Sequence, residues 1–287
     1  MEDIAMLDIK PTGQACGAYA TGVDLTKALD ADCIAEIRAA WLEHHVLVFP
    51  DQPMSDDDLE RFTLYFGDFG HDPFFAPIDG RENIAAIVRR ADETSPLFAE
   101  GWHTDWSFQD KPPIATCLMG LTIPPEGGDT YFANQHMAYD HLPDDLKAEI
   151  EGVVAIHSAE AAYAPDGMYG QDKEEESDRS MRIISSEEAR LKNEHPLVRP
   201  HTETGRPALF STIGYIQGFK GMSKEQSDDL LMRLYQHQTQ DKFVYRHKWK
   251  PNMLVMWDNR CLLHRASGGY DGYDRLLHRT TISERAA

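Results

Sequence analysis

Residues 101–112, "GWHTDWSFQDKP", place a histidine and a carboxylate two positions apart, at His103 and Asp105. If this segment is extended, side chains at positions i and i+2 point to the same side of the chain. One imidazole nitrogen and one carboxylate oxygen could then bind the same metal ion. An isolated pair of this kind is more often an ordinary hydrogen-bonded contact, so a metal site requires a third ligand from elsewhere in the chain.

His264 is the predicted third ligand. It lies in residues 252–265, "NMLVMWDNRCLLHR", where a strand, a turn fixed by Asp258 and Asn259, and a second strand would carry it back across the core. Two histidines and one carboxylate on one face of an ion, with the opposite positions open, are typical of non-haem Fe(II) oxygenases. Catalytic zinc accepts the same residue types, so a zinc-dependent hydrolase is an open alternative.

Two arginines downstream favour the oxygenase. Arg275 and Arg279 stand four apart in "RLLHR", which puts both on one face of a strand in an otherwise acidic chain. Buried guanidinium groups require carboxylate-like partners. A carboxylate cosubstrate and an anionic substrate would supply two such partners, although the spacing alone fits two surface arginines in salt bridges equally well.

The rest of the chain predicts a β core with flanking helices. Hydrophobic periodicity and capping residues, among them Asp30, Ser55 and the capping-box pair Ser223 and Gln226, predict helices over residues 29–45, 55–67, 142–152 and 223–238. Apolar and β-branched runs predict strands over residues 46–50, 115–123, 152–158, 207–213, 242–249, 252–258 and 275–282.

No repeat, linker or long low-complexity tract divides the sequence, so residues 1–287 are expected to form one domain, a jelly roll or a barrel. Residues 159–195 lack clear periodicity and contain the acidic run "QDKEEESDR". This segment is expected to be a solvated loop, with a lid over a site as the functional alternative.

Composition limits the partners and the compartment. The 287 residues carry 28 Lys and Arg against 48 Asp and Glu, a net charge of −20, which argues against binding to nucleic acids or anionic membranes. The four cysteines are widely spaced and form no CxxC pair, which indicates free thiols. With no apolar run long enough for a signal peptide or a membrane span, the protein is expected to be soluble and cytoplasmic.

Four motifs, taken in order, resemble the Fe(II)- and 2-oxoglutarate-dependent dioxygenases of the taurine and 2,4-dichlorophenoxyacetate type, the TauD/TfdA family. They are "WHTDWSF" (102–108), "PPEGGDTYFAN" (124–134), "FVYRHKW" (243–249) and "WDNRCLLHRASGGYDGYDRLLHRTTI" (257–282). The resemblance implies a double-stranded β-helix, which is a jelly roll. It also implies that Fe(II), 2-oxoglutarate and O2 take part in hydroxylation of the substrate, and that the protein can form a homodimer or homotetramer.

Carried over position by position, the resemblance makes His103, Asp105 and His264 the iron ligands. It makes Thr130 and Arg275 the partners of the distal carboxylate of 2-oxoglutarate. Arg279 matches the arginine that in several members holds the anionic end of the substrate.

The substrate is expected to be a small organic anion with an apolar body: an aryloxyalkanoate, an alkyl sulfate or a sulfonate. Phe75 and Trp106 are candidate walls of an apolar pocket, and His71 is a further candidate lining residue. Hydroxylation next to such a heteroatom group would often release that group. A catalytically inactive anion-binding protein on the same scaffold is the alternative outside enzymes, and the presence of both Asp105 and Arg275 argues against it.

Overall fold

A computed structural model describes residues 7–170 and 177–285. Its largest sheet has eight strands in the order β1-β2-β3-β14-β6-β16-β4, with β5 paired to β16. Within this sheet β2 and β3 run parallel, and the other pairs are antiparallel. The strands are β1 (Asp8–Pro11), β2 (Ala18–Thr21), β3 (Val46–Phe49), β4 (Asp68–Phe69), β5 (Ala85–Arg89), β6 (Ala115–Thr122), β14 (Leu254–Asp258) and β16 (Arg275–Ser283).

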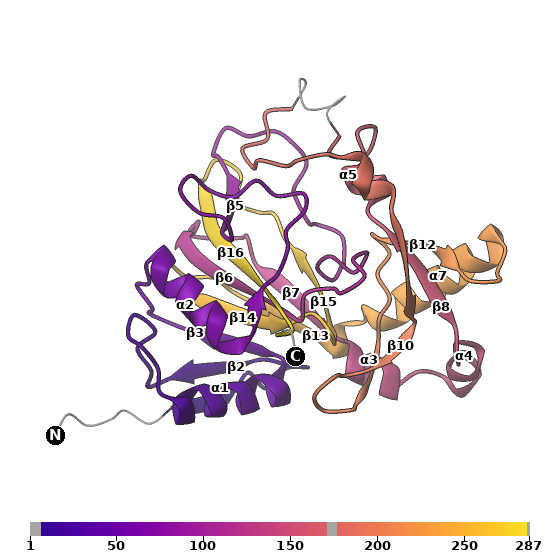
Figure 1. Cartoon of the computed structure of the whole chain (residues 1–287), viewed down its shortest axis with the longest axis horizontal. Coiled ribbons are helices and arrows are strands. Elements are labelled where there is room, and N and C mark those ends of the chain that lie inside the picture. The colour runs from indigo at the N-terminus through magenta and orange to yellow at the C-terminus, as the bar shows by residue number, and fades with distance from the viewer. Residues whose placement is uncertain (1–6, 171–176, 286–287) are drawn as a thin grey trace.

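A second, three-stranded sheet faces the first across the core (Figure 1). It consists of β13 (Val244–His247), β7 (Thr130–Asn134) and β15 (Leu262–Ala266), all antiparallel. Phe132, Tyr245 and Leu262 of this sheet pack in one buried cluster with Val255 and Trp257 of β14. The two facing sheets form a jelly roll, which confirms the mainly β fold predicted from the sequence.

The strands in the middle of the large sheet are buried on both faces. Along β14, Val255 and Trp257 point to the small sheet, whereas Leu254 and Met256 pack against helices on the opposite side. This alternation is the period of two that a strand imposes on its side chains. It explains why residues 253–257 form a continuous apolar run, because neither face of this stretch meets water.

Two N-terminal helices, α1 (Ala31–His44) and α2 (Asp56–Phe66), cover the outer face of the large sheet (Figure 1). Both begin where the sequence predicts. The Asp30 side chain accepts a hydrogen bond from the backbone N–H of Cys33, and Ser55 forms a capping box with Asp58. Trp41 is fully buried beneath α1, and α2 ends before Gly67.

The segment between β7 and β13 builds a separate layer beside the jelly roll. It contains a three-stranded sheet, a two-stranded sheet and α7, which starts at the predicted capping box of Ser223 and Gln226. Its elements are α3 (Gln135–Asp140), α4 (Asp144–Glu149), β8 (Val154–Ser158), α5 (Glu160–Tyr163), η1 (Glu187–Arg190), β9 (Lys192–Pro196), β10 (Val198–Pro200), β11 (Pro207–Leu209), β12 (Ile216–Phe219), α7 (Lys224–Gln238) and η2 (Asp241–Phe243).

One strand expectation needs correction. The strand expected over residues 207–213 ends at Leu209. It also lies outside the two sheets of the jelly roll and pairs only with β10. β8 likewise lies outside them, in the three-stranded sheet. Alternating apolar residues predict that one side of a strand is buried, but they do not predict which layer covers that side. The sequence therefore could not show that these strands lie outside the two sheets of the jelly roll.

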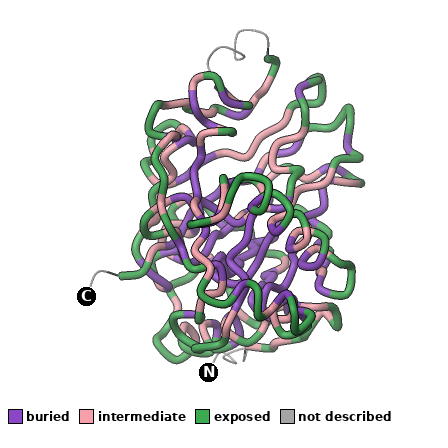
Figure 2. Tube along the Cα trace, turned by 90° about the vertical axis from the view of Figure 1, so that its right-hand side faces the viewer, coloured by how far each residue is buried: buried purple, intermediate pink, exposed green. Residues whose placement is uncertain are grey.

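Burial follows the layers. Figure 2 shows buried residues concentrated along the interior of the molecule, with exposed residues on the outer turns and loops. The four cysteines are unpaired, as expected. Within residues 7–170 and 177–285, no helix is both long and apolar enough to cross a lipid bilayer.

The central position of β14 makes Leu254 a test of the fold. Leu254→Ala would leave a cavity between the large sheet and its helices, and we expect it to lower the free energy of unfolding by about 2–5 kcal/mol in urea titrations. Leu64→Ala is the control, because Leu64 is 43% exposed on α2 and should cost no more than about 0.5 kcal/mol. Equal effects of the two substitutions would contradict this account of the core.

Candidate metal and cosubstrate site

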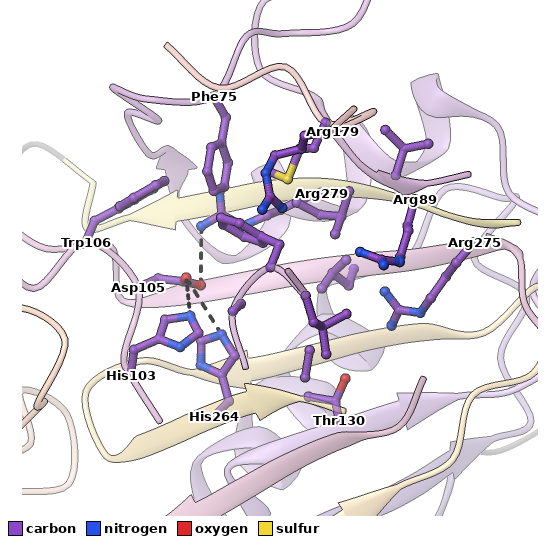
Figure 3. Close-up of a pocket in the computed structure, with 18 of the residues that line it drawn as sticks. Phe75, Arg89, His103, Asp105, Trp106, Thr130, Arg179, His264, Arg275 and Arg279 are labelled. Atoms are coloured by element: carbon purple, nitrogen blue, oxygen red, sulfur yellow. Dashed lines mark ion pairs between the residues drawn. The ribbon is translucent and has the colours of Figure 1, made fainter. Parts of the chain in front are cut away.

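The side chains of His103, Asp105 and His264 point toward one another (Figure 3). One potential ligand atom from each lies within 4.8 Å of the others. The Nε2 atoms of His103 and His264 are 3.9 Å and 3.7 Å from Oδ1 of Asp105. His264 comes from the middle of β15, whereas His103 and Asp105 come from the loop that precedes β6.

The two histidines meet through their backbones. The N–H of His103 donates to the carbonyl oxygen of His264 at 3.0 Å, and the N–H of His264 donates back at 2.7 Å. This two-bond bridge adds one residue of the loop to the edge of β15. It places the imidazole rings side by side, with centroids 4.2 Å apart.

The extended geometry assumed for the whole His103 to Asp105 segment is wrong. Only His103 has a strand-like pairing, and Asp105 begins a turn that runs to Phe108. Trp106 adopts the left-handed region, with φ of 48°, and its carbonyl accepts the N–H of Gln109. The turn, together with the bridge to β15, therefore directs Asp105 toward the histidines.

A chain of hydrogen bonds holds the Asp105 carboxylate. The Thr116 hydroxyl donates to Oδ2 of Asp105 at 2.6 Å, and Nδ2 of Asn259 donates to the same hydroxyl at 2.9 Å. Oδ1 of Asn259 accepts the indole N–H of Trp257, also at 2.9 Å. Asn259, which was expected to fix the turn before His264, thus also helps to hold Asp105 through Thr116. Nothing in the sequence had pointed to Thr116 as part of the site.

The electrostatics suit a cation at this place. Burial lowers the pKa of His264 to about 3 and also lowers that of His103, so both imidazoles are neutral. Nδ1–H of His103 donates to the carbonyl of Gly101, which leaves the lone pair on Nε2, the atom that faces Asp105. Burial alone would raise the pKa of Asp105, but the neighbouring Arg279 guanidinium and the two imidazoles outweigh it and hold that pKa well below its usual range.

These properties make a donor set of two neutral nitrogens and one carboxylate oxygen. Such a set fits Fe(II) with open positions, and it fits zinc as well. The residues of the structure therefore satisfy the ligand requirement predicted from the sequence, while the choice of metal depends on what surrounds them.

A buried cation stands beside this triad. Arg275 is 7% exposed at the start of β16, and its Nη2 donates to the carbonyl of Gly128 at 3.2 Å. Among the described residues it forms no ion pair with a carboxylate, and its Nε–H has no hydrogen-bond partner. Burial accordingly lowers the pKa of Arg275. An unpaired buried guanidinium is a binding site for an external anion.

Thr130 lies on the same side as His264. It pairs with Ala266 on β15, two residues from His264, so the three side chains face one cavity. Oγ1 of Thr130 accepts the indole N–H of Trp249 at 2.9 Å. Its own hydroxyl proton is therefore free to be donated to a ligand. Trp249 belongs to a motif noted in the sequence, but its contact with Thr130 was not predicted.

One cavity joins these groups. Phe75, Phe98, Trp106 and Tyr163 form its aromatic wall, and Figure 3 shows Phe75 and Trp106 beside Asp105. The expectation for His71 is wrong, because its side chain is exposed and does not line the cavity. His71 is exposed, whereas Phe74 and Phe75, which follow it, are buried.

Residues 159–195 contribute to the cavity in their described part. Tyr163 of α5 and Met181 are both buried in the cluster that contains Phe75 and Trp106. Arg179 also lines the cavity. The described part of the segment therefore covers one side of the site. Residues 171–176, the first part of the acidic run, lie outside the described residues.

Arg279 lines the cavity on the same face of β16 as Arg275, but its charge is already matched. Its Nη1 is 2.7 Å from Oδ2 of Asp72, and its Nη2 is 3.3 Å from Oδ2 of Asp105. The guanidinium lies 5.0 Å and 5.2 Å from the ring centroids of Phe75 and Trp106. The indole N–H of Trp106 also donates to Asp72. The sequence did not point to Asp72 as part of the site.

Comparison with known proteins gives consistent matches. The family model described as "Taurine catabolism dioxygenase TauD, TfdA family" matches residues 8–281. The chain is 34% identical to an alkylsulfatase of Acinetobacter baylyi, over 96% of this chain and 84% of that protein. It is 35% identical to an alpha-ketoglutarate-dependent 2,4-dichlorophenoxyacetate dioxygenase of Cupriavidus pinatubonensis, over 93% of this chain and 96% of that one.

A solved structure agrees with these relatives. It is that of a putative alpha-ketoglutarate-dependent taurine dioxygenase from Burkholderia xenovorans, superimposed with a TM-score of 0.80. The two chains are 33% identical, and the match covers 97% of this chain and 93% of the other. The similarity thus includes both sheets of the jelly roll and the layer beside them.

Thr116 provides a test of how the triad is held. Thr116→Val keeps the shape of the side chain but removes the donor to Asp105, and we expect divalent-metal affinity to fall about 10- to 100-fold in Mn(II) titrations. Thr63→Val is the matched control, because Thr63 is equally buried and bonds Leu59 and Thr280 away from the triad. A Thr116 variant that binds Mn(II) as tightly as the Thr63 variant would refute this role.

Proposed function

The chain belongs to the TauD/TfdA family of Fe(II)- and 2-oxoglutarate-dependent dioxygenases, and on that premise we propose that it oxidises a small organic acid with an apolar body. We assign the iron ligands to His103, Asp105 and His264. The support is their convergence within 4.8 Å and the neutral state of both imidazoles. When bound, the metal and 2-oxoglutarate supply O2 activation, in which succinate and CO2 form as one oxygen atom enters a C–H bond of the substrate.

The observation that carries this proposal is the unpaired guanidinium of Arg275. A buried cation without a carboxylate partner is costly unless a ligand provides one. We assign the distal carboxylate of 2-oxoglutarate to Arg275, with the hydroxyl of Thr130 as a second donor. Arg275 can offer a charge-assisted pair of N–H groups, and Trp249 orients the Thr130 hydroxyl by donating to it.

The zinc hydrolase alternative accounts for less of the site. Two histidines and an aspartate would hold zinc, but hydrolysis would leave Arg275 and the free hydroxyl of Thr130 without a ligand. The alternative of an inactive anion-binding protein would leave the ordered carboxylate of Asp105 unexplained. The dioxygenase uses all of these groups.

The remaining residues position the substrate and exclude water. Phe75, Phe98, Trp106 and Tyr163 give the cavity an apolar wall suited to an alkyl chain or an aromatic ring. This wall supports alkyl sulfates or aryloxyalkanoates, the substrate classes named for the two relatives, as the substrate class of this chain. Oxidation at a carbon that bears a sulfate ester or an aryl ether oxygen would release that group.

We further propose that the chain acts as one catalytic domain in a reducing, cytoplasmic environment. The four unpaired cysteines support that compartment. The net charge of −20 disfavours nucleic acid and anionic membrane partners. Assembly into a dimer or tetramer stays a prediction, and sedimentation equilibrium would test it.

Arg275→Gln tests the cosubstrate site. Loss of the cation should raise the KM for 2-oxoglutarate at least about 30-fold, as expected for one partner of a buried charge pair, and should leave Mn(II) affinity unchanged. Arg199→Gln is the control, because Arg199 is also partly buried but stacks on Phe210 outside the cavity. An unchanged KM in the Arg275 variant would remove the main support for the proposal.

Metal removal tests the reaction class. Treatment with a chelator should abolish 2-oxoglutarate-dependent oxygen consumption, and Fe(II) but not Zn(II) should restore it, since zinc has no redox chemistry. Asp105→Ala should bind metal weakly and show no such restoration. Activity that returns with zinc in the absence of oxygen would instead establish the hydrolase.

A further inference from the structure

Carboxylates neutralise only part of the positive charge in the cavity. Arg89 lies 3.2 Å from the carboxylate of Glu93, and Arg279 is paired with both Asp72 and Asp105. Two further arginines that line the cavity form no ion pair with a carboxylate of the described residues: Arg179 and Arg275. A dioxygenase of the proposed kind binds two organic acids, so the cavity offers one unpaired cation for each.

Arg279 is a poor receptor for a second acid. Its two terminal nitrogens already face the carboxylates of Asp72 and Asp105, and the rings of Phe75 and Trp106 cover its guanidinium. A substrate anion placed there would be the third negative group around a single positive charge, and it would be repelled by Asp72. Arg279 instead positions Asp105, Asp72 and, through Asp72, the indole of Trp106.

Arg179, unlike Arg279, has N–H donors that no carboxylate of the described residues occupies. Its Nη2 donates to the carbonyl of Pro96 at 2.9 Å, and its guanidinium lies 5.1 Å from the ring centroid of Tyr169. Among the described residues these contacts use one of its five N–H donors, and no carboxylate pairs with its charge. In Figure 3 it lies across the cavity from His103 and His264.

Arg179 also lies where the cavity meets a second hollow. Together with Leu97 and Met181, it lines both the inner cavity and an adjoining outer hollow. A cation at this junction attracts an acid from solvent and can hold it while the apolar part of the molecule contacts the aromatic wall.

We propose that Arg179 binds the acid group of the organic substrate, a carboxylate, sulfate or sulfonate, with the apolar body of the substrate against Phe75, Phe98 and Tyr163. This inference rests on the proposed function and names a subsite within it. It replaces the sequence-based expectation that Arg279 holds this anion. Because Arg279 is paired with Asp72 and Asp105, Arg275, which we assign to the cosubstrate, is the remaining arginine of the inner cavity without an ion pair among the described residues.

The test measures binding without turnover. Protein loaded with Mn(II) and 2-oxoglutarate under argon is titrated with hexyl sulfate, with 2,4-dichlorophenoxyacetate and with the neutral amide of the latter, by calorimetry. We expect Arg179→Gln to weaken both acids about tenfold or more and to leave the amide unchanged, as for a lost hydrogen bond to a charged group. Arg179→Lys should retain part of the preference for acids.

The matched control is Arg182→Gln, three residues further along, because the Arg182 side chain is 68% exposed and pairs with Asp79 outside the cavity. This variant should bind all three probes as the wild type does. The subsite is refuted if Arg179→Gln keeps the wild-type affinity for the acids, or if the wild type binds neither acid more tightly than the amide. Failure of the proposed function is separate, since it would appear as absence of 2-oxoglutarate-dependent oxygen consumption in the Fe(II)-loaded wild type.

Discussion

The pair of backbone hydrogen bonds between His103 and His264 is the constraint on which the site depends. It joins a loop to the edge strand β15, and so places two imidazoles from distant parts of the chain side by side. Every other group is placed relative to this bridge. The turn that follows brings Asp105 back to the rings, Thr116 and Asn259 hold its carboxylate, and β7 sets Thr130 beside β15.

Charge matching governs the rest of the cavity. The chain as a whole is strongly acidic, yet four arginines surround a single cavity. Arg89 and Arg279 are paired with carboxylates of the protein, whereas Arg275 and Arg179 form no ion pair with a carboxylate of the described residues, and we propose that these two bind the ligands. Unpaired buried charge is unfavourable in the folded protein alone, so the cost of keeping Arg275 unpaired is consistent with a site built for an anion.

The aromatic residues connect the packing of the fold to the site. Phe75, Trp106 and Tyr163 belong to one buried cluster and also face the cavity, so the same side chains stabilise the protein and shape the space for a substrate. The indole of Trp106 adds a link, because it donates to Asp72, which in turn pairs with Arg279. A change in this wall would therefore alter both packing and the charge arrangement beside the metal ligands.

The sequence by itself determined much of the local structure. The caps of α1, α2 and α7 were readable because Asp30, Ser55 and Ser223 satisfy backbone N–H groups only a few residues away. The β core and the pair of His103 and Asp105 were also accessible, since strand periodicity and close spacing are linear features. The resemblance to the family narrowed the choice of jelly roll or barrel to a jelly roll and supplied the iron-ligand roles of this pair and His264. Arg275 and Arg279 could be placed on one face because a strand repeats every two residues.

Only the tertiary structure decided the environment of those groups. No linear pattern connects Asp72 to Arg279, or Trp249 to Thr130, because these partners are far apart in the sequence and meet only after the sheets close. The outward position of His71 and the turn at Asp105 depend on which neighbours are buried. Whether a charge is neutralised is a property of distances in three dimensions, so the sequence could point to Arg275 and Arg279 but could not show that, among the described residues, only Arg279 of these two forms ion pairs with carboxylates.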